Sequence, residues 1–357
     1  MNDLKLIVLD NIKELGKEVD NHLKKMNKTD SSYIMKLTRD RFSNGEGKIR
    51  IDETIRDKDV FIMADVGNYG ETYSMHGIEV IMGPDEHFQD IKRAISALSG
   101  YARRITVVMP LLYQSRQDKR KGRESLDCAL ALQELERLKV NHIITFDCHQ
   151  REVSNAIPNL PFENIYPTNS ILEDLVDDVS IKKALIIAPD MGAMERARYY
   201  ADMLKVDVGV FYKRRDLSKV VNGKNPIVEH AYMGADVTGR TCIVVDDIIA
   251  SGGSMIEVGE KLKEKGAKKV IFIASFALFT EGIEKFNEAY KNKVFSALYT
   301  TNLTYIPKEI KSKRWLKIVD CSQRIAELIN GIHKGKSIYK IIYESEKIFK
   351  LINQKKF

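Results

Sequence analysis

Short apolar segments recur along the chain, separated by intervals long enough to hold a helix. They are rich in valine, isoleucine and leucine, and their apolar residues are consecutive instead of alternating with polar ones. This pattern predicts strands that are buried on both faces of a sheet. The segments are Leu6–Leu9, Val60–Met63, Ile105–Met109, His142–Phe146, Ala184–Ala188, Val208–Tyr212, Cys242–Val245 and Val270–Ala274.

The intervals between these segments carry the repeat of amphipathic helices. The predicted helices are Phe88–Tyr101, Ala129–Leu138, Met194–Leu204, Met255–Lys265 and Ile283–Tyr290. The N-terminus is likewise predicted to be a strand followed by a helix, and not a signal peptide. Alternating strands and helices are typical of an α/β protein with mainly parallel sheets.

A proline cluster divides this alternation. Pro158, Pro161 and Pro167 lie in a stretch with little periodicity. Because proline donates no hydrogen bond to a sheet and restricts the residue before it, we expect the chain to cross there between two domains. The length of 357 residues suits two domains. We place an N-terminal domain at residues 1–160 and a C-terminal domain at 161–336.

Two segments look like additions to these domains. Residues 67–83 are rich in glycine and tyrosine and are expected to form a surface loop or a small hairpin. Residues 337–357 place isoleucine and phenylalanine among lysine and glutamate, which is the pattern of an amphipathic C-terminal helix. We expect this helix to pack on its own protein or on another subunit, and not on a membrane.

Composition and charge narrow the class of protein. Hydrophobic residues make up 44% and charged residues 30%, which is a globular composition without a bilayer-spanning run. We expect a cytoplasmic protein. The net charge of +7 suits small anionic substrates, since no nucleic-acid-binding signature is visible. The scattered cysteines are expected to be buried free thiols: Cys128, Cys148, Cys242 and Cys321.

The strongest local motif follows an apolar strand. Two adjacent carboxylates, Asp246 and Asp247, end the strand. A loop of small residues then opens a helix: Ala250, Ser251, Gly252, Gly253 and Ser254. Backbone N–H groups at such a helix start can bind a sugar 5-phosphate, and the carboxylates can accept hydrogen bonds from ribose hydroxyls. The plainer alternative is that the two aspartates cap the helix.

This stretch resembles the phosphoribosyl-diphosphate-binding motif that phosphoribosyltransferases share with ribose-phosphate diphosphokinases. Other stretches resemble the diphosphokinases in particular, and the resemblance covers most of residues 4–340. One of them, Arg41 to Glu46, is similar to the family's loop that holds the adenine of ATP, often across a subunit boundary. The resemblance implies nucleotide-binding roles for Phe42, Asn44 and Glu46.

Further stretches resemble the family's sites for nucleotide phosphates and metal. The segment Ser115 to Glu124 is similar to its Arg-Gln-Asp-Arg segment, which implies that Arg116 and Gln117 hold the nucleotide. His149 matches a histidine that contacts the Mg²⁺–ATP complex. Asp190 lies in a stretch similar to Ser-Pro-Asp-x-Gly and would be a ligand of Mg²⁺, directly or through water.

The last resemblance is at Tyr212-Lys213-Arg214-Arg215, which looks like the root of the family's mobile catalytic loop. It implies that Lys213 and Arg215 stabilise the charge that develops on the transferred group. The polar loop 216–226 behind them suits a lid.

Taken with the strand pattern, the resemblance implies two phosphoribosyltransferase-like domains, each a mainly parallel sheet flanked by helices. It implies an Mg²⁺-dependent enzyme that transfers the diphosphate of ATP to the anomeric hydroxyl of ribose 5-phosphate. It also implies a homo-oligomer that is built from dimers, with a hexamer as one option. No nucleic acid or membrane partner is expected.

Two alternatives stay open. A phosphoribosyltransferase would share the loop at 246–254 but has no evident need of the segment at Arg116 or of the loop at Lys213. A catalytically inactive regulatory homologue would explain why Met191 and Ala250 differ from the residues usual in the family. Asn44 also differs, since aspartate is usual there. The retained cationic and metal-binding positions argue against this second alternative.

Overall fold

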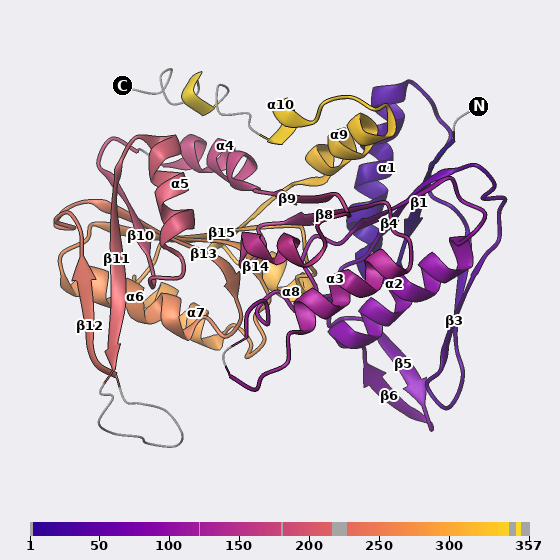
Figure 1. The fold of residues 1–357 in the computed structure, drawn as a ribbon. Coiled ribbons are helices and arrows are strands. Elements are labelled where there is room, and N and C mark those ends of the chain that lie inside the picture. Colours follow the sequence, from indigo (N-terminus) through magenta and orange to yellow (C-terminus); the bar gives the residue numbers. More distant parts are fainter. Residues whose placement is uncertain (1–2, 121, 180, 216–226, 343–347, 351–357) are drawn as a thin grey trace. The chain divides into compact units, whose positions relative to one another are not determined.

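The computed structural model of the protein describes residues 3–120, 122–179, 181–215, 227–342 and 348–350, with the backbone alone for 213–215 and 227–230. The chain forms two compact units (Figure 1). The first comprises Met1–Pro167, Asn302–Pro307 and Asp320–Tyr343, and the second comprises Thr168–Thr301, Lys308–Val319 and Glu344–Phe357.

The first unit is built on a parallel sheet with the strand order β1-β4-β7-β8-β9. Its strands are β1 (Leu4–Val8), β4 (Asp59–Met63), β7 (Arg104–Val108), β8 (His142–Phe146) and β9 (Phe162–Ile165). Helices cover both faces, with α1 and α9 on one side and α2 and α3 on the other (Figure 1). They are α1 (Lys13–Asn27), α2 (Pro84–Leu98), α3 (Asp127–Arg137) and α9 (Ser322–His333). Short 3₁₀ turns occur at Asp10–Ile12 and Arg151–Ala156.

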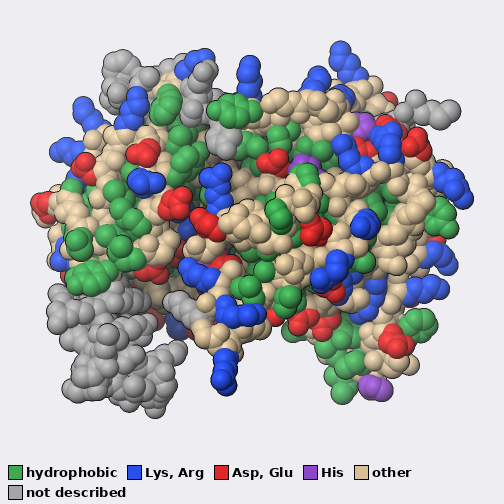
Figure 2. Space-filling view, viewed as in Figure 1, with side chains coloured by type: hydrophobic (Ala, Val, Ile, Leu, Met, Phe, Trp, Pro, Cys, Tyr) green, Lys and Arg blue, Asp and Glu red, His purple; other side chains and the backbone are tan. Residues whose placement is uncertain are grey.

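Two antiparallel hairpins project from the first unit. One is β2 (Leu37–Arg41) with β3 (Gly47–Ile51), and the other is β5 (Thr72–Met75) with β6 (Ile78–Ile81). The segment 67–83 therefore forms a hairpin, one of its two predicted forms. The backbone N–H of His76 donates to the carbonyl of Ser43 at 2.9 Å, which ties the two hairpin tips together. Exposed hydrophobic side chains gather over β5 and β6 at the lower right of Figure 2.

The second unit has a larger sheet with the order β12-β11-β10-β13-β14-β15-β16, which is parallel except for β12. Its strands are β10 (Ala184–Ala188), β11 (Asp207–Arg215), β12 (Ile227–Met233), β13 (Thr241–Ile249), β14 (Lys269–Ala277), β15 (Ala297–Thr301) and β16 (Leu316–Val319). Its helices are α4 (Thr168–Asp178), α5 (Met194–Leu204), α6 (Gly253–Glu264), α7 (Glu284–Lys291) and α8 (Lys308–Lys311).

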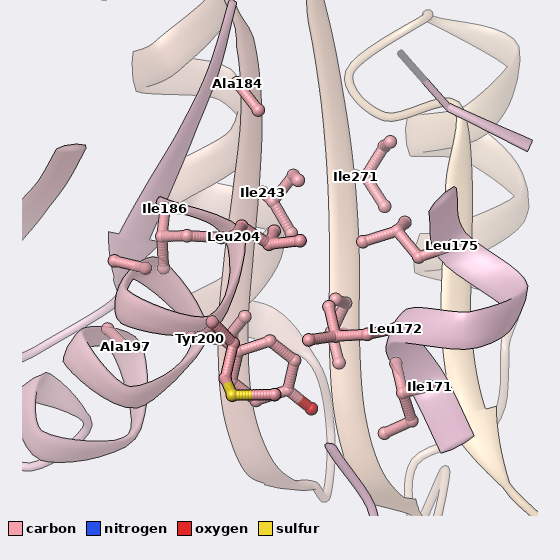
Figure 3. Packing of buried hydrophobic residues seen from close by; sticks show 14 of the residues in the cluster. Ile171, Leu172, Leu175, Ala184, Ile186, Ala197, Tyr200, Leu204, Ile243 and Ile271 are labelled. Atoms are coloured by element: carbon pink, nitrogen blue, oxygen red, sulfur yellow. The ribbon is translucent and has the colours of Figure 1, made fainter. Parts of the chain in front are cut away.

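The core of the second unit shows why its central strands are mostly apolar. Leu172 and Leu175 from α4 and Tyr200 from α5 pack against Ile243 and Ile271 of the sheet (Figure 3). Other helices, α6 among them, contact the same strands, so most residues of β13 and β14 are buried. Every strand and helix predicted from periodicity between Leu6 and Tyr290 is present, and the α/β fold with mainly parallel sheets is confirmed.

The division into units differs from the predicted boundary between residues 160 and 161. Strand β9 pairs with β8 in the first sheet, so the first unit extends to Pro167. The predicted second domain at 161–336 also loses 302–307 and 320–336, because α9 packs on α1. His333 on α9 reinforces this packing, since its Nδ1 lies 2.7 Å from the buried carboxylate of Asp59.

The predicted C-terminal helix at 337–357 is described only in part. Residues Tyr339–Ile342 form α10 in the first unit, and 348–350 are helical in the second. Ile348 is buried in the core of the second unit, and the Lys205 ammonium lies 4.9 Å from the Phe349 ring centroid. Residues 343–347 and 351–357 lie outside the described residues.

The four cysteines are buried thiols that form no disulfide, as predicted. Burial raises the pKa of Cys128 to about 12 and that of Cys242 to about 11, so both are inert thiols near neutral pH. Among the helices that the structure describes, none has the length and apolarity needed to cross a membrane.

A buried carboxylate fastens the returning segment 302–307 within the first unit. Asp65, which follows β4, accepts hydrogen bonds from the Thr304 hydroxyl at 3.1 Å and from the backbone N–H of Tyr305 at 2.7 Å. The N–H of Gly67 donates to it as well, at 2.9 Å. Burial outweighs these hydrogen bonds and raises the pKa of Asp65 to about 7.

We expect the Asp65→Asn variant to lose a pH dependence of stability. Because the pKa of Asp65 rises from 3.8 to about 7 on folding, the folded state holds the proton more tightly than the unfolded state. The stability that this proton contributes is complete below the unfolded pKa and is lost as the pH rises through the folded pKa. Since one pKa unit corresponds to about 1.4 kcal/mol, the loss is at most about 4 kcal/mol.

Thermal unfolding followed by circular dichroism from about pH 5 to about pH 8 measures this effect. The melting temperature of the natural protein should fall relative to that of the variant as the pH rises. Two curves that stay parallel over this range would show that Asp65 does not titrate there.

Candidate active site

Polar residues follow three neighbouring strands of the second unit. Strands β11, β10 and β13 are adjacent and parallel, so their carboxyl ends meet at one edge of the sheet. Asp190 follows β10, Lys213 and Arg215 lie in the last part of β11, and Asp246 and Asp247 lie in the last part of β13. Ligands of open α/β sheets bind at such an edge.

The two aspartates lie within a strand that is longer than predicted. β13 continues to Ile249 beside β14, whereas its pairing with β10 ends at Val244. Asp246 and Asp247 therefore lie beyond the last pair with β10. Helix α6 begins at Gly253 with Gly252 as its N-cap, so neither aspartate occupies the capping position that the plainer alternative assigned to them.

An arginine that the sequence pattern does not single out faces this pair of acids. Arg196 on α5 has only 11% of its side chain exposed, and its guanidinium lies 3.9 Å from Asp246 Oδ1 and 3.6 Å from Asp247 Oδ2. Burial and the adjacent Asp247 raise the pKa of Asp246 well above its usual range, and Arg196 opposes this rise. An arginine on an amphipathic helix usually faces the solvent. The sequence pattern therefore gave no reason to assign Arg196 to the site.

Asp190 shapes the turn between β10 and α5. Its Oδ1 accepts hydrogen bonds from the backbone N–H groups of Gly192 at 2.8 Å and Ala193 at 3.1 Å. Asp190 remains exposed at the edge of the sheet. The neighbouring Met191 is also exposed, with no aromatic or ionisable function to offer a ligand.

The small-residue loop after β13 has the shape that its composition predicts. Gly252 has φ +78°, and a Cβ atom there would lie 2.0 Å from Cζ of Phe286. Leu278 and Thr280 donate backbone hydrogen bonds to Ile249 and Ala250, at 2.8 and 3.0 Å, which fastens the start of the loop. Gly253 and Ser254 are exposed. Since the first N–H groups of a helix have no acceptor within the helix, this start of α6 can bind an anion.

Lys213 and Arg215 are placed by their backbone alone. Within the antiparallel β11–β12 ladder, Lys213 is opposite His230 and Arg215 is opposite Ile227. The predicted lid at 216–226 lies outside the described residues. Both cationic positions are thus at the carboxyl half of β11, and their roles stay predictions.

The first unit brings together two of the predicted nucleotide-binding stretches. His149 follows β8 and its Nδ1 lies 2.8 Å from Asp118 Oδ2 in the stretch that follows β7. The Gln117 side chain donates to the carbonyl of Ser125 at 3.0 Å, so it stiffens its own loop. Arg116 is exposed and can reach a ligand.

The predicted adenine-binding residues lie at the turn of the β2–β3 hairpin. Phe42 is 53% exposed and offers an open aromatic face. The Asn44 Oδ1 accepts a hydrogen bond from the backbone N–H of Glu46 at 3.2 Å, so part of the asparagine amide holds the turn. Arg41 beside them is held by the carboxylate of Asp90 at 3.1 Å. This hairpin and the His149 stretch are separate elements of the first unit.

The described residues suit an Mg²⁺ ion that is coordinated mainly by water and substrate phosphates. Among the described residues, no group of three or more His, Cys, Asp or Glu side chains is close enough to form a protein cage for a metal. Mg²⁺ commonly keeps several waters and uses one or two carboxylates together with substrate phosphates. The exposed Asp190 suits such a site, and the side chain of His149 is 37% exposed.

Comparison with known proteins identifies both halves of the chain. Residues 4–138 match the N-terminal domain of ribose phosphate pyrophosphokinase, and residues 164–302 match the phosphoribosyl transferase domain. The crystal structure of phosphoribosylpyrophosphate synthetase from Mycobacterium smegmatis has the same fold, with a TM-score of 0.77 and 23% identity over 93% of this chain and 99% of that one.

Curated relatives extend the likeness over nearly the full length. A ribose-phosphate pyrophosphokinase of Vibrio cholerae is 30% identical over 345 residues, which is 95% of this chain and 98% of the relative. Ribose-phosphate pyrophosphokinase 3 of Saccharomyces cerevisiae is 28% identical, over 85% of this chain and 87% of its own. The two domain matches, the shared fold and this identity over both chains together show that the chain belongs to the ribose-phosphate pyrophosphokinase family of enzymes.

Proposed function

We propose that the protein transfers the diphosphate of ATP to the anomeric hydroxyl of ribose 5-phosphate, which yields phosphoribosyl diphosphate and AMP. The observation that carries this proposal is the exposed start of α6 beside Asp246 and Asp247, at the same sheet edge as Lys213 and Asp190. A sugar phosphate requires an anion site and paired hydrogen-bond acceptors for its hydroxyls. A transferred diphosphate requires a cation.

The ribose 5-phosphate site is assigned to the second unit. The N–H groups at the start of α6 and the hydroxyls of Ser251 and Ser254 would bind the 5-phosphate. Asp246 and Asp247 would accept hydrogen bonds from the ribose hydroxyls, with Arg196 holding the two carboxylates in place. Gly252 keeps the loop close enough to the phosphate, since any side chain there would meet Phe286.

The nucleotide is assigned to residues of the first unit. Phe42 would stack on the adenine, while Asn44 and Glu46 pair with its edge. Arg116 and Gln117 would bind the phosphates. His149, and Asp190 of the second unit, would be ligands of Mg²⁺, which would supply charge neutralisation for the phosphate oxygens. The exposure of Phe42 fits a base site that a second subunit completes, and we propose a homo-oligomer built from dimers in the cytoplasm.

The proposed transfer needs no covalent enzyme intermediate. The anomeric oxygen attacks the β-phosphorus of ATP, the bond from that phosphorus to the α,β-bridging oxygen breaks, and AMP leaves. The hydroxyl proton is released to solvent. Lys213 and Arg215 would stabilise the negative charge that builds on the transferred group, because fixed cations in a desolvated site cost no reorganisation during the step.

We expect the purified protein to form AMP from ATP only when ribose 5-phosphate and Mg²⁺ are both present. Excess EDTA should lower the rate by about 100-fold or more, since the metal supplies most of the charge neutralisation, and added Mg²⁺ should restore it. Chromatographic separation of AMP and phosphoribosyl diphosphate measures the reaction, and the two products should form in equal amounts.

The same assay separates the alternatives. Consumption of phosphoribosyl diphosphate with a free base, without ATP, would indicate a phosphoribosyltransferase. A folded protein that forms no AMP alone but changes the activity of another family member would indicate a regulatory homologue. Either result would contradict the proposed reaction.

A further inference from the structure

Asp118 is a buried acid that makes a direct contact with a predicted metal-binding histidine. Its side chain is only 2% exposed, whereas that of His149 is 37% exposed. The Nδ1 atom of His149 lies 2.8 Å from Asp118 Oδ2. The two residues come from different loops, one after β7 and one after β8, so the contact is made by the fold and not by chain proximity.

The chemistry of the contact defines which ring nitrogen carries hydrogen. An ionised carboxylate can only accept a hydrogen bond, so Nδ1 of His149 must be the protonated donor. In the neutral imidazole the lone pair is then on Nε2, at the opposite side of the ring. Metal-binding histidines in general donate their second N–H to a carboxylate or a carbonyl, which sets the tautomer and makes the ligating nitrogen more basic.

The backbone before His149 is held in a fixed conformation. Asp147, two residues before His149, has φ +37°, an unfavourable conformation for a residue other than glycine. The next residue is held by the side chain of Asn164, whose Oδ1 accepts from the backbone N–H of Cys148 at 3.0 Å. Strain of this kind persists only where the surroundings impose it, and it turns the chain so that His149 leaves the strand end in a set direction.

The loop of Asp118 is closed by hydrogen bonds on either side of it. Cys128 donates its backbone N–H to the carbonyl of Gln117 at 3.3 Å, and the Gln117 side chain reaches Ser125. Asp118 Oδ1 is buried and accepts no hydrogen bond from the part of the chain that the structure describes. A carboxylate with so little access to water interacts strongly with the donor that the structure places beside it.

We propose that Asp118 is a positioning residue for the reaction: its carboxylate holds His149 in the Nδ1–H tautomer, with Nε2 directed outward to the Mg²⁺–nucleotide complex. This inference rests on the proposed function. Asp118 itself touches neither substrate nor metal in this assignment, and it acts through His149 alone.

The Asp118→Asn variant tests the inference, because asparagine has the same shape but can donate to Nδ1 and so permit the other tautomer. We expect kcat to fall by about 10- to 100-fold, with the KM for ribose 5-phosphate within about 2-fold of the natural value. Asp127→Asn is the matched control. It removes a nearby carboxylate at the start of α3 that accepts a hydrogen bond from the Ser125 hydroxyl at 2.7 Å, and it should keep full activity.

A double-mutant cycle distinguishes positioning from general structural support. If Asp118 acts through His149, the Asp118→Asn change should alter kcat by less than about 2-fold when His149 is already alanine. A second full loss in the His149→Ala background would overturn the inference, as would wild-type kcat in Asp118→Asn alone.

Nitrogen NMR of the metal-free protein with ¹⁵N-labelled histidine gives a readout that does not depend on activity. Comparison with His149→Gln identifies the His149 signals among the seven histidines. The natural protein should show Nδ1 protonated, and Asp118→Asn should shift the signals toward the Nε2–H form. An unchanged tautomer would refute the inference. If the natural protein formed no AMP, the proposed function would fail, while the tautomer result would still be judged on its own.

Discussion

Replacing Lys213 with alanine is expected to lower kcat by about 100- to 1000-fold, while the KM for ribose 5-phosphate changes much less. The reason is that a cation aimed at the transferred group interacts most strongly when charge accumulates in the transition state. Strand β11 runs beside β10 and places Lys213 near the carboxyl edge of the sheet, where the proposed substrates would bind. Steady-state release of AMP at saturating ATP measures the effect.

Lys285→Ala is the matched control for that experiment. Lys285 is an exposed lysine of α7 in the same unit, and its ammonium pairs with Glu281 at 2.9 Å. Since exposed ion pairs contribute little, its loss should leave kcat within about 2-fold of the natural value. Full activity in Lys213→Ala would remove this residue from the reaction. Equal losses in both variants would point to a general effect of charge.

The Gly252→Ala variant is expected to bind ribose 5-phosphate about 10- to 100-fold more weakly, because displacing a binding loop by about 1 Å is enough to disrupt it. Alanine is unfavourable at φ +78°, and its Cβ would lie 2.0 Å from the ring of Phe286, so the loop has to move. The second unit should also lose about 2 kcal/mol or more of stability from strain and overpacking.

Calorimetric titration with ribose 5-phosphate measures the affinity, and urea unfolding followed by the fluorescence of Trp315 measures the stability of the second unit. Gly239→Ala is the control, since Gly239 has φ +70° with no atom within 4 Å of the added Cβ. It should cost about 1 kcal/mol and leave binding unchanged. If Gly252→Ala behaved like Gly239→Ala in both measurements, the loop would not be the phosphate site.

Local burial explains which elements could be predicted. Strand β10 and helix α5 have the bounds that their apolar pattern predicts, because β10 is buried along its whole length and α5 is buried along one face. Strand β9 was not predicted. It contains Glu163 and Asn164, and it lies at the edge of its sheet, where less of a strand has to be apolar.

The periodicity of the sequence does not determine to which unit each segment belongs. Of the three prolines, Pro167 ends the first segment of the first unit, whereas Pro158 and Pro161 precede strand β9, which still belongs to that unit. The return of 302–307 and of α9 to the first unit depends on what these segments contact. The amphipathic pattern of α9 is compatible with packing on either unit, and the contacts of Asp65 and Asp59 with this region are invisible in the sequence.

For the candidate site, the sequence by itself determined the parts: small residues and acids after β13, a histidine after β8, and cations in β11. The acids and small residues could be found because polar residues that follow a buried strand fall at the carboxyl edge of a parallel sheet, whereas the histidine and the cations were found through the resemblance to the family. Only the tertiary structure decided how they are held. The partner of His149 lies 31 residues away, and Arg196 reaches two acids on another strand. Such contacts depend on strand order and helix docking, which a pattern of local burial does not encode.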